Sequence, residues 1–132
     1  MAFQLNKTFT ADKANKGVEF EYIDPATGEC TGAFVTMYGF ESKAYRDFQT
    51  EKSRKKLADK KRDTFQTAEE QHAEAVEMFV ALFASWRGFV DNEGVEVKAD
   101  KETVYQAFDK SEPLRSQALA AITGPASFLP SA

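Results

Sequence analysis

The chain contains few of the residues that build cross-links or metal sites. Its 132 residues include one cysteine, Cys30, and one histidine, His72. A single cysteine excludes an internal disulfide and a cysteine-based zinc site. The low cysteine content is typical of proteins in a reducing compartment. His72 has Glu69, Glu70 and Glu74 as neighbours at helical spacing but no second histidine, so a solvated histidine is favoured over a metal ligand. We therefore expect no metal and no cofactor.

Long apolar stretches are also missing. No run approaches the roughly 20 apolar residues that span a bilayer. The start, MAFQLNKTFTADK, lacks the apolar region of a secretory signal. DNEGVEVKAD resembles a calcium loop, but placing Gly94 at the sixth position puts Phe89 at the first, where an acidic residue is required. We expect a soluble cytoplasmic protein that binds no calcium.

Catalytic motifs are absent as well. The chain has no G-x-S-x-G elbow, P-loop, dinucleotide fingerprint or H-E-x-x-H pair, and no two carboxylates are marked as an acid/base pair. We expect a protein that is not an enzyme. A hydrophobic share of 42% with twelve phenylalanines nevertheless indicates a folded chain, and 132 residues suit a single domain spanning residues 1–132.

The first third of the chain predicts β-structure. Apolar and polar residues alternate in VEFEYI (18–23), DPATGE supplies a turn, and a second alternating arm runs over 32–38. These segments predict a β-hairpin over 18–38. Phe3 and Leu5 alternate with polar residues in the same way and predict a short edge strand near the start. An isolated hairpin is marginal in water, so it must pack on other elements.

The rest of the chain predicts mainly helices. Possible N-caps stand at Ser42, Thr67, Asp100 and Ser111. The predicted helices span 43–62, 67–87, 100–109 and 112–122, with a brief strand at Val95 and Val97 and a short apolar tail at the end. Helix 67–87 carries the main apolar stripe. The predicted fold class is α+β, mainly helical, with an N-terminal hairpin or small antiparallel sheet packed on about four helices.

Charge is distributed unevenly although the net charge is only −4. Residues 43–62 carry nine Lys/Arg against three acids, and residues 63–77 carry five acids with no Lys/Arg. Glu51, Lys55 and Arg62 interrupt the apolar stripe of helix 43–62. The basic run 52–62 has three interpretations. A surface complementary to a neighbouring helix or a protein partner is favoured over nucleic-acid binding and over a simply solvated face.

Two stretches resemble a known family. TGAFVTMYGFESKAYR, followed by the basic helix, and WRGFVDNEGVEVKADKETVYQAFDKSEPLRSQALAAITGPASF are similar to the tail assembly chaperones of long-tailed (siphovirus-like) phages and prophages. The similarity extends from about residue 18 to 128 and consists of spaced apolar residues and turns. The matching positions are Trp86, Gly88, Asp91, Gly94, Pro113, Arg115, Gln117 and Phe128, and we expect most of them to be structural.

The resemblance implies a function in assembly. Members of the family bind the tape measure protein, keep it soluble and help tail tube subunits assemble around it. The implied site of action is the host cytoplasm, and the chaperone is absent from the finished tail. A longer, frameshifted form often recruits the tube protein. Homo-oligomers are expected, because self-association would cover exposed apolar surface. The alternatives are a small nucleic-acid-associated regulator using helix 52–62 and a structural tail component.

Candidate partner-binding residues come from the interrupted helix, the aromatic positions and the apolar tail. Helix-in-groove recognition needs apolar anchors with flanking charges, and aromatic residues concentrate binding energy. The candidates are Phe48, Lys55, Trp86, Phe89, Phe108, Phe128 and Leu129.

Overall fold

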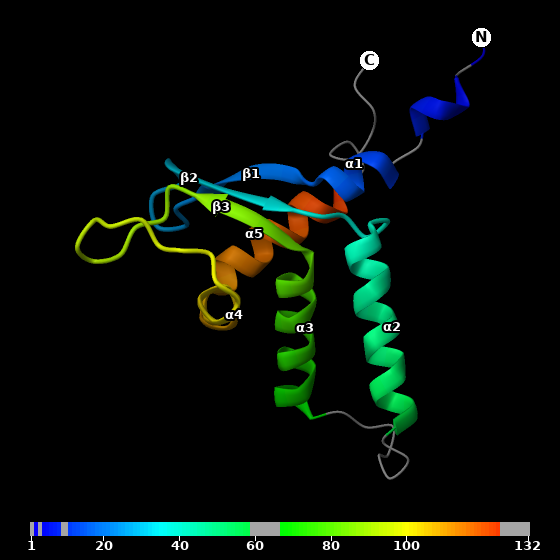
Figure 1. Cartoon of the computed structure of the whole chain (residues 1–132). Helices are drawn as coiled ribbons and strands as arrows, with labels where there is room; N and C mark the ends of the chain where they lie inside the picture. The colour runs from blue at the N-terminus through cyan, green and yellow to red at the C-terminus, as the bar shows by residue number, and fades with distance from the viewer. Residues whose placement is uncertain (1, 3, 9–10, 59–66, 125–132) are drawn as a thin grey trace.

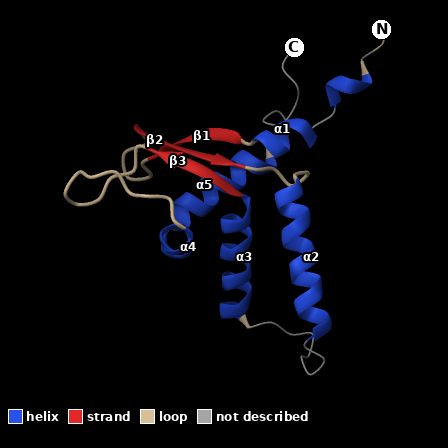
Figure 2. Cartoon of the chain, in the orientation of Figure 1, coloured by secondary structure: helices blue, strands red, loops and turns tan. Residues whose placement is uncertain are grey.

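The computed structural model describes residues 2, 4–8, 11–58 and 67–124. The elements follow in the order η1 (Leu5–Thr8, a 3-10 helix), α1 (Ala11–Lys16), β1 (Val18–Ile23), β2 (Cys30–Met37), α2 (Lys43–Ala58), α3 (Ala68–Leu82), β3 (Phe83–Arg87), α4 (Lys101–Lys110) and α5 (Glu112–Thr123). The fold is α+β and mainly helical, with a small antiparallel sheet, as predicted (Figure 2). No helix in these ranges is long and apolar enough to cross a membrane.

The predicted hairpin over 18–38 is confirmed. β1 and β2 pair antiparallel with Phe20 opposite Val35 and Val18 opposite Met37. The connecting turn is closed by Gly28, which has a φ of +73° and donates its N–H to the Asp24 carbonyl at 2.7 Å. Glycine adopts this positive φ without the steric penalty of a Cβ. The alternating side chains thus place one apolar face of the hairpin toward the helices.

The third strand corrects the prediction of a helix over 67–87. Helix α3 ends at Leu82, and Phe83 adopts an extended conformation with φ −70° and ψ 129°. β3 then pairs antiparallel with β2, placing Trp86 opposite Val35 and Phe83 opposite Met37. Pairing with β2 provides partners for Phe83 and for residues 85–87, with a shift of register at Ala84. It also leaves the side chains of Phe83 and Trp86 partly buried. This advantage depends on pairing with a strand roughly 50 residues earlier in the chain, so helical spacing alone predicted the wrong element for residues 83–87.

Two smaller strand predictions are also wrong. Residues 5–8 form η1 instead of an edge strand, and Leu5 is 72% exposed, while Phe3 lies outside the described residues. Two alternating residues are too short a signal to define a strand. Val95 and Val97 lie in a loop that carries only an isolated bridge between Val90 and Glu96. The tight turn at 91–94 leaves these arms too short for a ladder.

One hydrophobic core joins the inner face of the sheet to α3, α4 and α5. Helix α5 crosses beneath the sheet, and α4 packs beside α3 (Figure 1). The buried members are Ala14, Val35, Met37, Val76, Phe79, Leu82, Val104, Phe108, Leu114, Ala118 and Ile122. Phe83, Trp86 and Phe89 are partly buried against this cluster. Phe79 is thus a core residue, and the other three aromatic side chains border the core.

The predicted helix starts are accurate because side chains cap them. Ser42 Oγ accepts the Tyr45 N–H at 3.2 Å, and Thr67 Oγ1 accepts the Glu70 N–H at 3.1 Å. Asp100 and Ser111 cap α4 and α5 in the same manner. The predicted spans 100–109 and 112–122 are correct to within one residue. Helix α2 is described as far as Ala58, and the remainder of the predicted span 43–62 lies outside the described residues.

Several positions of the family resemblance hold the backbone together, as expected. The Gln117 side chain accepts the Ile23 N–H and donates to the Ile23 carbonyl, both at 2.8 Å, so it pairs with the outer edge of β1. Arg115 donates to the carbonyls of Phe108 and Asp109 at the end of α4, at 2.6 and 2.9 Å. The indole of Trp86 donates to the Val97 carbonyl at 3.0 Å. These positions define the fold rather than a chemical site.

Replacing Gln117 with alanine is expected to lower the free energy of unfolding by about 1–3 kcal/mol, since it leaves both backbone groups of partly buried Ile23 without their partner. Denaturant unfolding and hydrogen exchange at the Ile23 amide would measure the loss. The matched control is Gln71→Ala on an exposed face of α3, for which a change within about 0.5 kcal/mol is expected. Equal effects of the two substitutions would contradict the structural role of Gln117.

Candidate functional site

A groove of about 1270 Å³ runs between α2 and α3 and continues to α4. The two helices leave the sheet side by side and run in opposite directions (Figure 1). α2 lines the groove with Phe48, Glu51, Lys52, Lys55 and Lys56, and α3 with Glu70, Ala73, Glu74, Glu77, Val80 and Ala81. Phe83, Ala84, Ala99, Lys101, Val104 and Tyr105 complete it near the sheet and α4. We call this site the α2–α3 groove.

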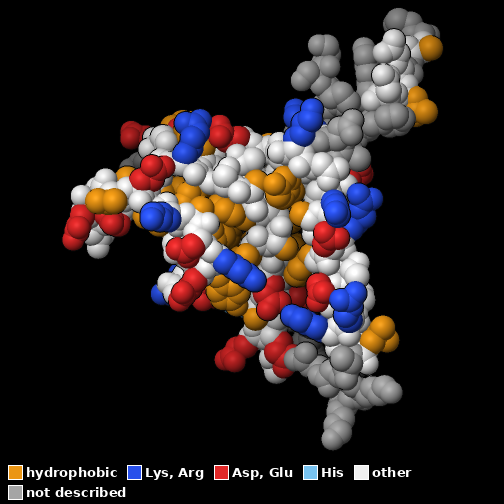
Figure 3. Space-filling model, in the orientation of Figure 1, with side chains coloured by type: hydrophobic (Ala, Val, Ile, Leu, Met, Phe, Trp, Pro, Cys, Tyr) orange, Lys and Arg blue, Asp and Glu red, His pale blue; other side chains and the backbone are white. Residues whose placement is uncertain are grey.

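The part of the groove near the sheet is apolar. Val80, Ala81 and Ala84 form a half-buried surface of small and medium side chains, flanked by Phe48 and Tyr105. Figure 3 shows hydrophobic side chains gathered in the hollow below the sheet, with Lys and Asp/Glu side chains around them. Small residues at the floor permit a helix to approach closely, and the larger side chains supply the apolar contact.

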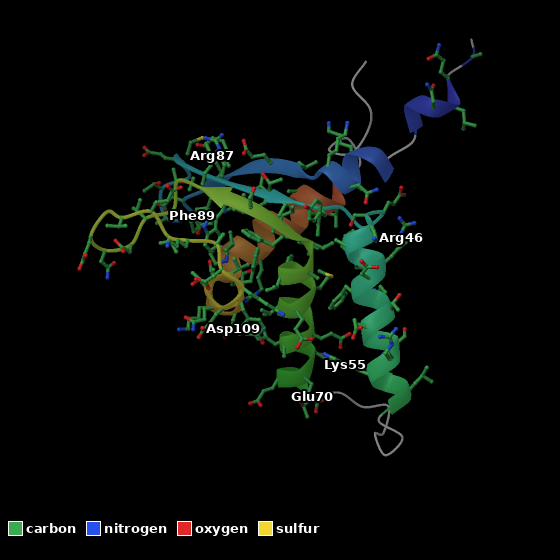
Figure 4. All side chains as sticks on the ribbon, viewed as in Figure 1. Arg46, Lys55, Glu70, Arg87, Phe89 and Asp109 are labelled. Carbon is green, nitrogen blue, oxygen red and sulfur yellow. The ribbon has the colours of Figure 1, made fainter. Side chains whose placement is uncertain are left out.

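The charges of the groove are balanced but separated. Four lysines line it, three of them on α2, and four glutamates line it, three of them on α3. Figure 4 shows Lys55 on the side of α2 that faces α3, and Arg46 on the other side of α2. A nucleic-acid groove needs a continuous positive surface, and this arrangement does not provide one. It suits instead a polypeptide that carries both signs of charge.

An ion pair crosses the groove. Lys52 of α2 pairs with Glu74 of α3, and the two side chains are 33% and 21% exposed. One lysine of the basic run therefore contacts an acidic neighbouring helix, as expected for a surface complementary to such a helix. Exposed pairs contribute little stability, about 0–1 kcal/mol, so this contact positions α2 more than it stabilises the fold.

The predicted partner-binding residues lie in different places. Phe48 and Lys55 line the α2–α3 groove. Trp86 packs against Phe89 with a ring-centroid distance of 5.3 Å, and Phe89 lines a second hollow of about 480 Å³ on the other side of α4. Phe128 and Leu129, like the rest of the predicted apolar tail, lie outside the described residues.

Phe108 corrects the sequence prediction. Its side chain is 0% exposed and stacks on Phe79 with a centroid distance of 5.3 Å. Helical periodicity placed Phe108 on the apolar face of its helix but could not distinguish a face that meets the core from one that meets a partner. A fully buried ring cannot contact a partner while the fold is intact, so Phe108 is a core residue.

Several features of the site were not found from the sequence. The small or medium residues Ala73, Val80 and Ala81 line the groove from α3 at helical spacing, a signal that could have indicated a second, shallow face on this helix. His72 was expected to be solvated, and it is 42% exposed, yet its Nε2 lies 2.8 Å from the Asp109 carboxylate of α4. No local pattern relates these two residues, since they are 37 positions apart.

A polar cluster covers the outer face of the sheet. The Arg87 guanidinium lies 4.0 Å from the centre of the Phe34 ring and donates to both oxygens of the Glu19 carboxylate, at 3.3 and 3.0 Å. This hydrogen bonding lowers the pKa of Glu19 below its ordinary value. A hydrogen bond with Glu21 raises the pKa of the exposed Cys30 thiol, which makes the reactive thiolate rarer. Within the described residues, no three His, Cys, Asp or Glu side chains are grouped to hold a metal ion.

No family model, curated protein or solved structure matches this chain. The family resemblance therefore stays a prediction that depends on the quoted motifs.

Proposed function

We propose that this protein is a tail assembly chaperone of a long-tailed phage or prophage, and that it binds helical segments of the tape measure protein in the α2–α3 groove. The observation that carries the proposal is the groove itself, with an apolar floor and charged walls on two helices. From Glu70 to Ala81 it follows α3 for about 16 Å at 1.5 Å per residue, which accommodates roughly three turns of a bound helix.

The geometry supports this role better than the alternatives. An amphipathic helix laid into a groove buries its apolar face and keeps its charged flanks at the rim. A tape measure protein is long and helical, and it needs such cover before tail tube subunits enclose it. Action in the host cytoplasm, homo-oligomerisation, absence from the finished tail and a longer form that recruits the tube protein belong to the same proposal.

The alternative of a nucleic-acid-associated regulator is not favoured, because the groove carries as many glutamates as lysines and Lys52 is already paired with Glu74. Retention of a DNA complex at physiological salt would support it. Detection of the protein in purified particles would support the alternative of a structural tail component.

Co-expression with the tape measure protein of the same gene cluster tests the proposal. We expect the client to become soluble and to co-purify with the chaperone. Ala81→Trp fills the groove with a bulky side chain and is expected to weaken client binding at least about tenfold. Ala120→Trp, at an exposed position of α5 outside the groove, is the matched control and should bind the client like the wild type.

Circular dichroism would establish that both tryptophan variants are folded. If the client stays insoluble with the wild-type protein, or if Ala81→Trp binds it as tightly as Ala120→Trp does, the proposed use of the groove is wrong.

A further inference from the structure

We infer that the α2–α3 groove accepts one kind of client segment: an amphipathic helix with carboxylates on the flank that faces α2 and Lys or Arg on the flank that faces α3. The inference rests on the proposed function in one respect, since it takes the occupant to be a client helix. It adds the chemistry of that helix, which the proposed function leaves open.

The first argument concerns the charges of the groove that form no ion pair with another described residue. Lys52 is engaged by Glu74, but among the described residues no carboxylate forms an ion pair with Lys55 or Lys56. On the facing wall, Glu77 forms no ion pair with any described cation. All three side chains line the groove and are exposed. Glu51, which also lines the groove from α2, pairs with Arg54 of the same helix at 3.2 Å. The open groove therefore presents a net positive charge on its α2 side and negative charge on its α3 side.

The second argument concerns what an occupant does to these charges. A helix that fills the groove displaces water from its walls, and a charge covered without a partner loses several kcal/mol of hydration. A client helix with uncharged flanks, or with charges of one sign on both flanks, would cover the charges of at least one wall without giving them a partner. A client with acidic residues toward Lys55 and Lys56 and basic residues toward Glu77 avoids the loss on both walls.

The third argument concerns the length of the groove. Because α2 and α3 are antiparallel and Lys52 pairs with Glu74, Phe48 lies one turn nearer the sheet than the ion pair does. Val80, Ala81 and Ala84 continue the apolar surface in that direction. The unpaired lysines follow Lys52 on α2 and lie toward the opposite end. On α3, Glu77 follows Glu74 and lies about one turn nearer the sheet than the ion pair does. The client helix thus places its larger apolar residues near the sheet, its carboxylates toward the far end of α2, and its basic residues beside Glu77.

Two synthetic helical peptides with the same apolar face test the inference. The mixed peptide carries Glu on one flank and Lys on the other, and the basic peptide carries Lys on both flanks. We expect the wild-type protein to bind the mixed peptide at least about tenfold more tightly than the basic peptide, measured by titration calorimetry at low salt. The double variant Lys55→Glu/Lys56→Glu makes both walls acidic and should reverse this preference.

The matched control is Lys43→Glu/Arg46→Glu. It makes the same change in net charge on the same helix at two exposed positions outside the groove, and it should keep the wild-type preference. Circular dichroism would verify that both double variants fold.

The outcomes separate this inference from the proposed function. If the wild type binds both peptides equally or neither of them, or if the two double variants behave alike, the inference is overturned, even where the tape measure protein still co-purifies. If the peptide preferences are as expected but the tape measure protein is not made soluble, the chemistry of the groove is supported and the proposed client is wrong.

Discussion

Replacing Phe108 with alanine is expected to lower the free energy of unfolding by about 3–5 kcal/mol. The side chain is 0% exposed, stacks on Phe79 and meets the Phe83 ring edge to face at a centroid distance of 6.4 Å. Its removal leaves a cavity where α3, α4 and the sheet join, and the surrounding backbone cannot close it fully. Denaturant unfolding at constant m-value would measure the loss.

The informative comparison is Phe48→Ala on α2. Phe48 is half-buried and lines the α2–α3 groove, so its loss should cost only about 1 kcal/mol of stability while weakening client binding. Phe108→Ala should show the opposite pattern at temperatures where it remains folded. A variant of Phe108 that keeps full stability but loses the client would mean that the ring belongs to the interface and that its assignment to the core is wrong.

Replacing Gly88 with alanine is expected to destabilise the fold by about 3 kcal/mol or more. Gly88 has a φ of +85°, and a Cβ at this position would collide with the Gly32 carbonyl oxygen and lie 2.9 Å from the Ala33 Cα. The obstacle is backbone of β2, so it cannot move without disturbing the sheet. The positive φ alone costs a non-glycine residue about 1–2 kcal/mol, and the collision adds to that.

Gly94→Ala is the matched control, because Gly94 has a similar φ of +80° but no atom within 4 Å of the position a Cβ would take. We expect Gly94→Ala to lower the free energy of unfolding by only about 1–2 kcal/mol, because the variant has the strain of the positive φ without the collision. Thermal and denaturant unfolding of both variants would separate the two contributions. Equal losses would mean that β2 does not approach Gly88 as closely as the structure shows.

Part of the basic run of this chain lies in an acidic setting once the chain is folded. A run of seven Lys/Arg in residues 52–62 invites a nucleic-acid interpretation. In the fold, the part of that run that is described lies across from the glutamates of α3 and shares a groove with them. Within residues 11–58 and 67–124, the charges that line the groove lie on two opposing walls and do not form a continuous positive surface, which favours a polypeptide client.

Prediction from the sequence succeeded where the deciding interactions are local. The caps at Ser42, Thr67, Asp100 and Ser111 each satisfy a backbone N–H within a few residues, so the starts of α2 to α5 could be predicted. The hairpin over 18–38 was predictable for the same reason, since its turn and its alternation lie in adjacent segments. Phe48 and Lys55, which were singled out because they lie in or interrupt the apolar stripe of one helix, both line the α2–α3 groove.

Prediction from the sequence failed where contacts with a distant segment of the chain determine the local structure. FASWR can continue a helix or form a strand, and only the presence of β2 alongside selects β3. Phe108 and Phe48 look alike as aromatic residues on amphipathic helices, and only packing buries one and leaves the other at the rim. The pairing of His72 with Asp109 joins two helices whose relation no local pattern encodes.

The sequence by itself determined the fold class, the order of most elements and the asymmetry of charge, because turns, caps and periodicity act over a few residues. The tertiary structure alone decided that β3 completes the sheet, that α2 stands beside α3 with an open groove, and which aromatic rings face the core. These outcomes depend on burial of apolar surface and on pairing of backbone and charge between segments far apart in the chain. Such contacts exist only once the chain has folded.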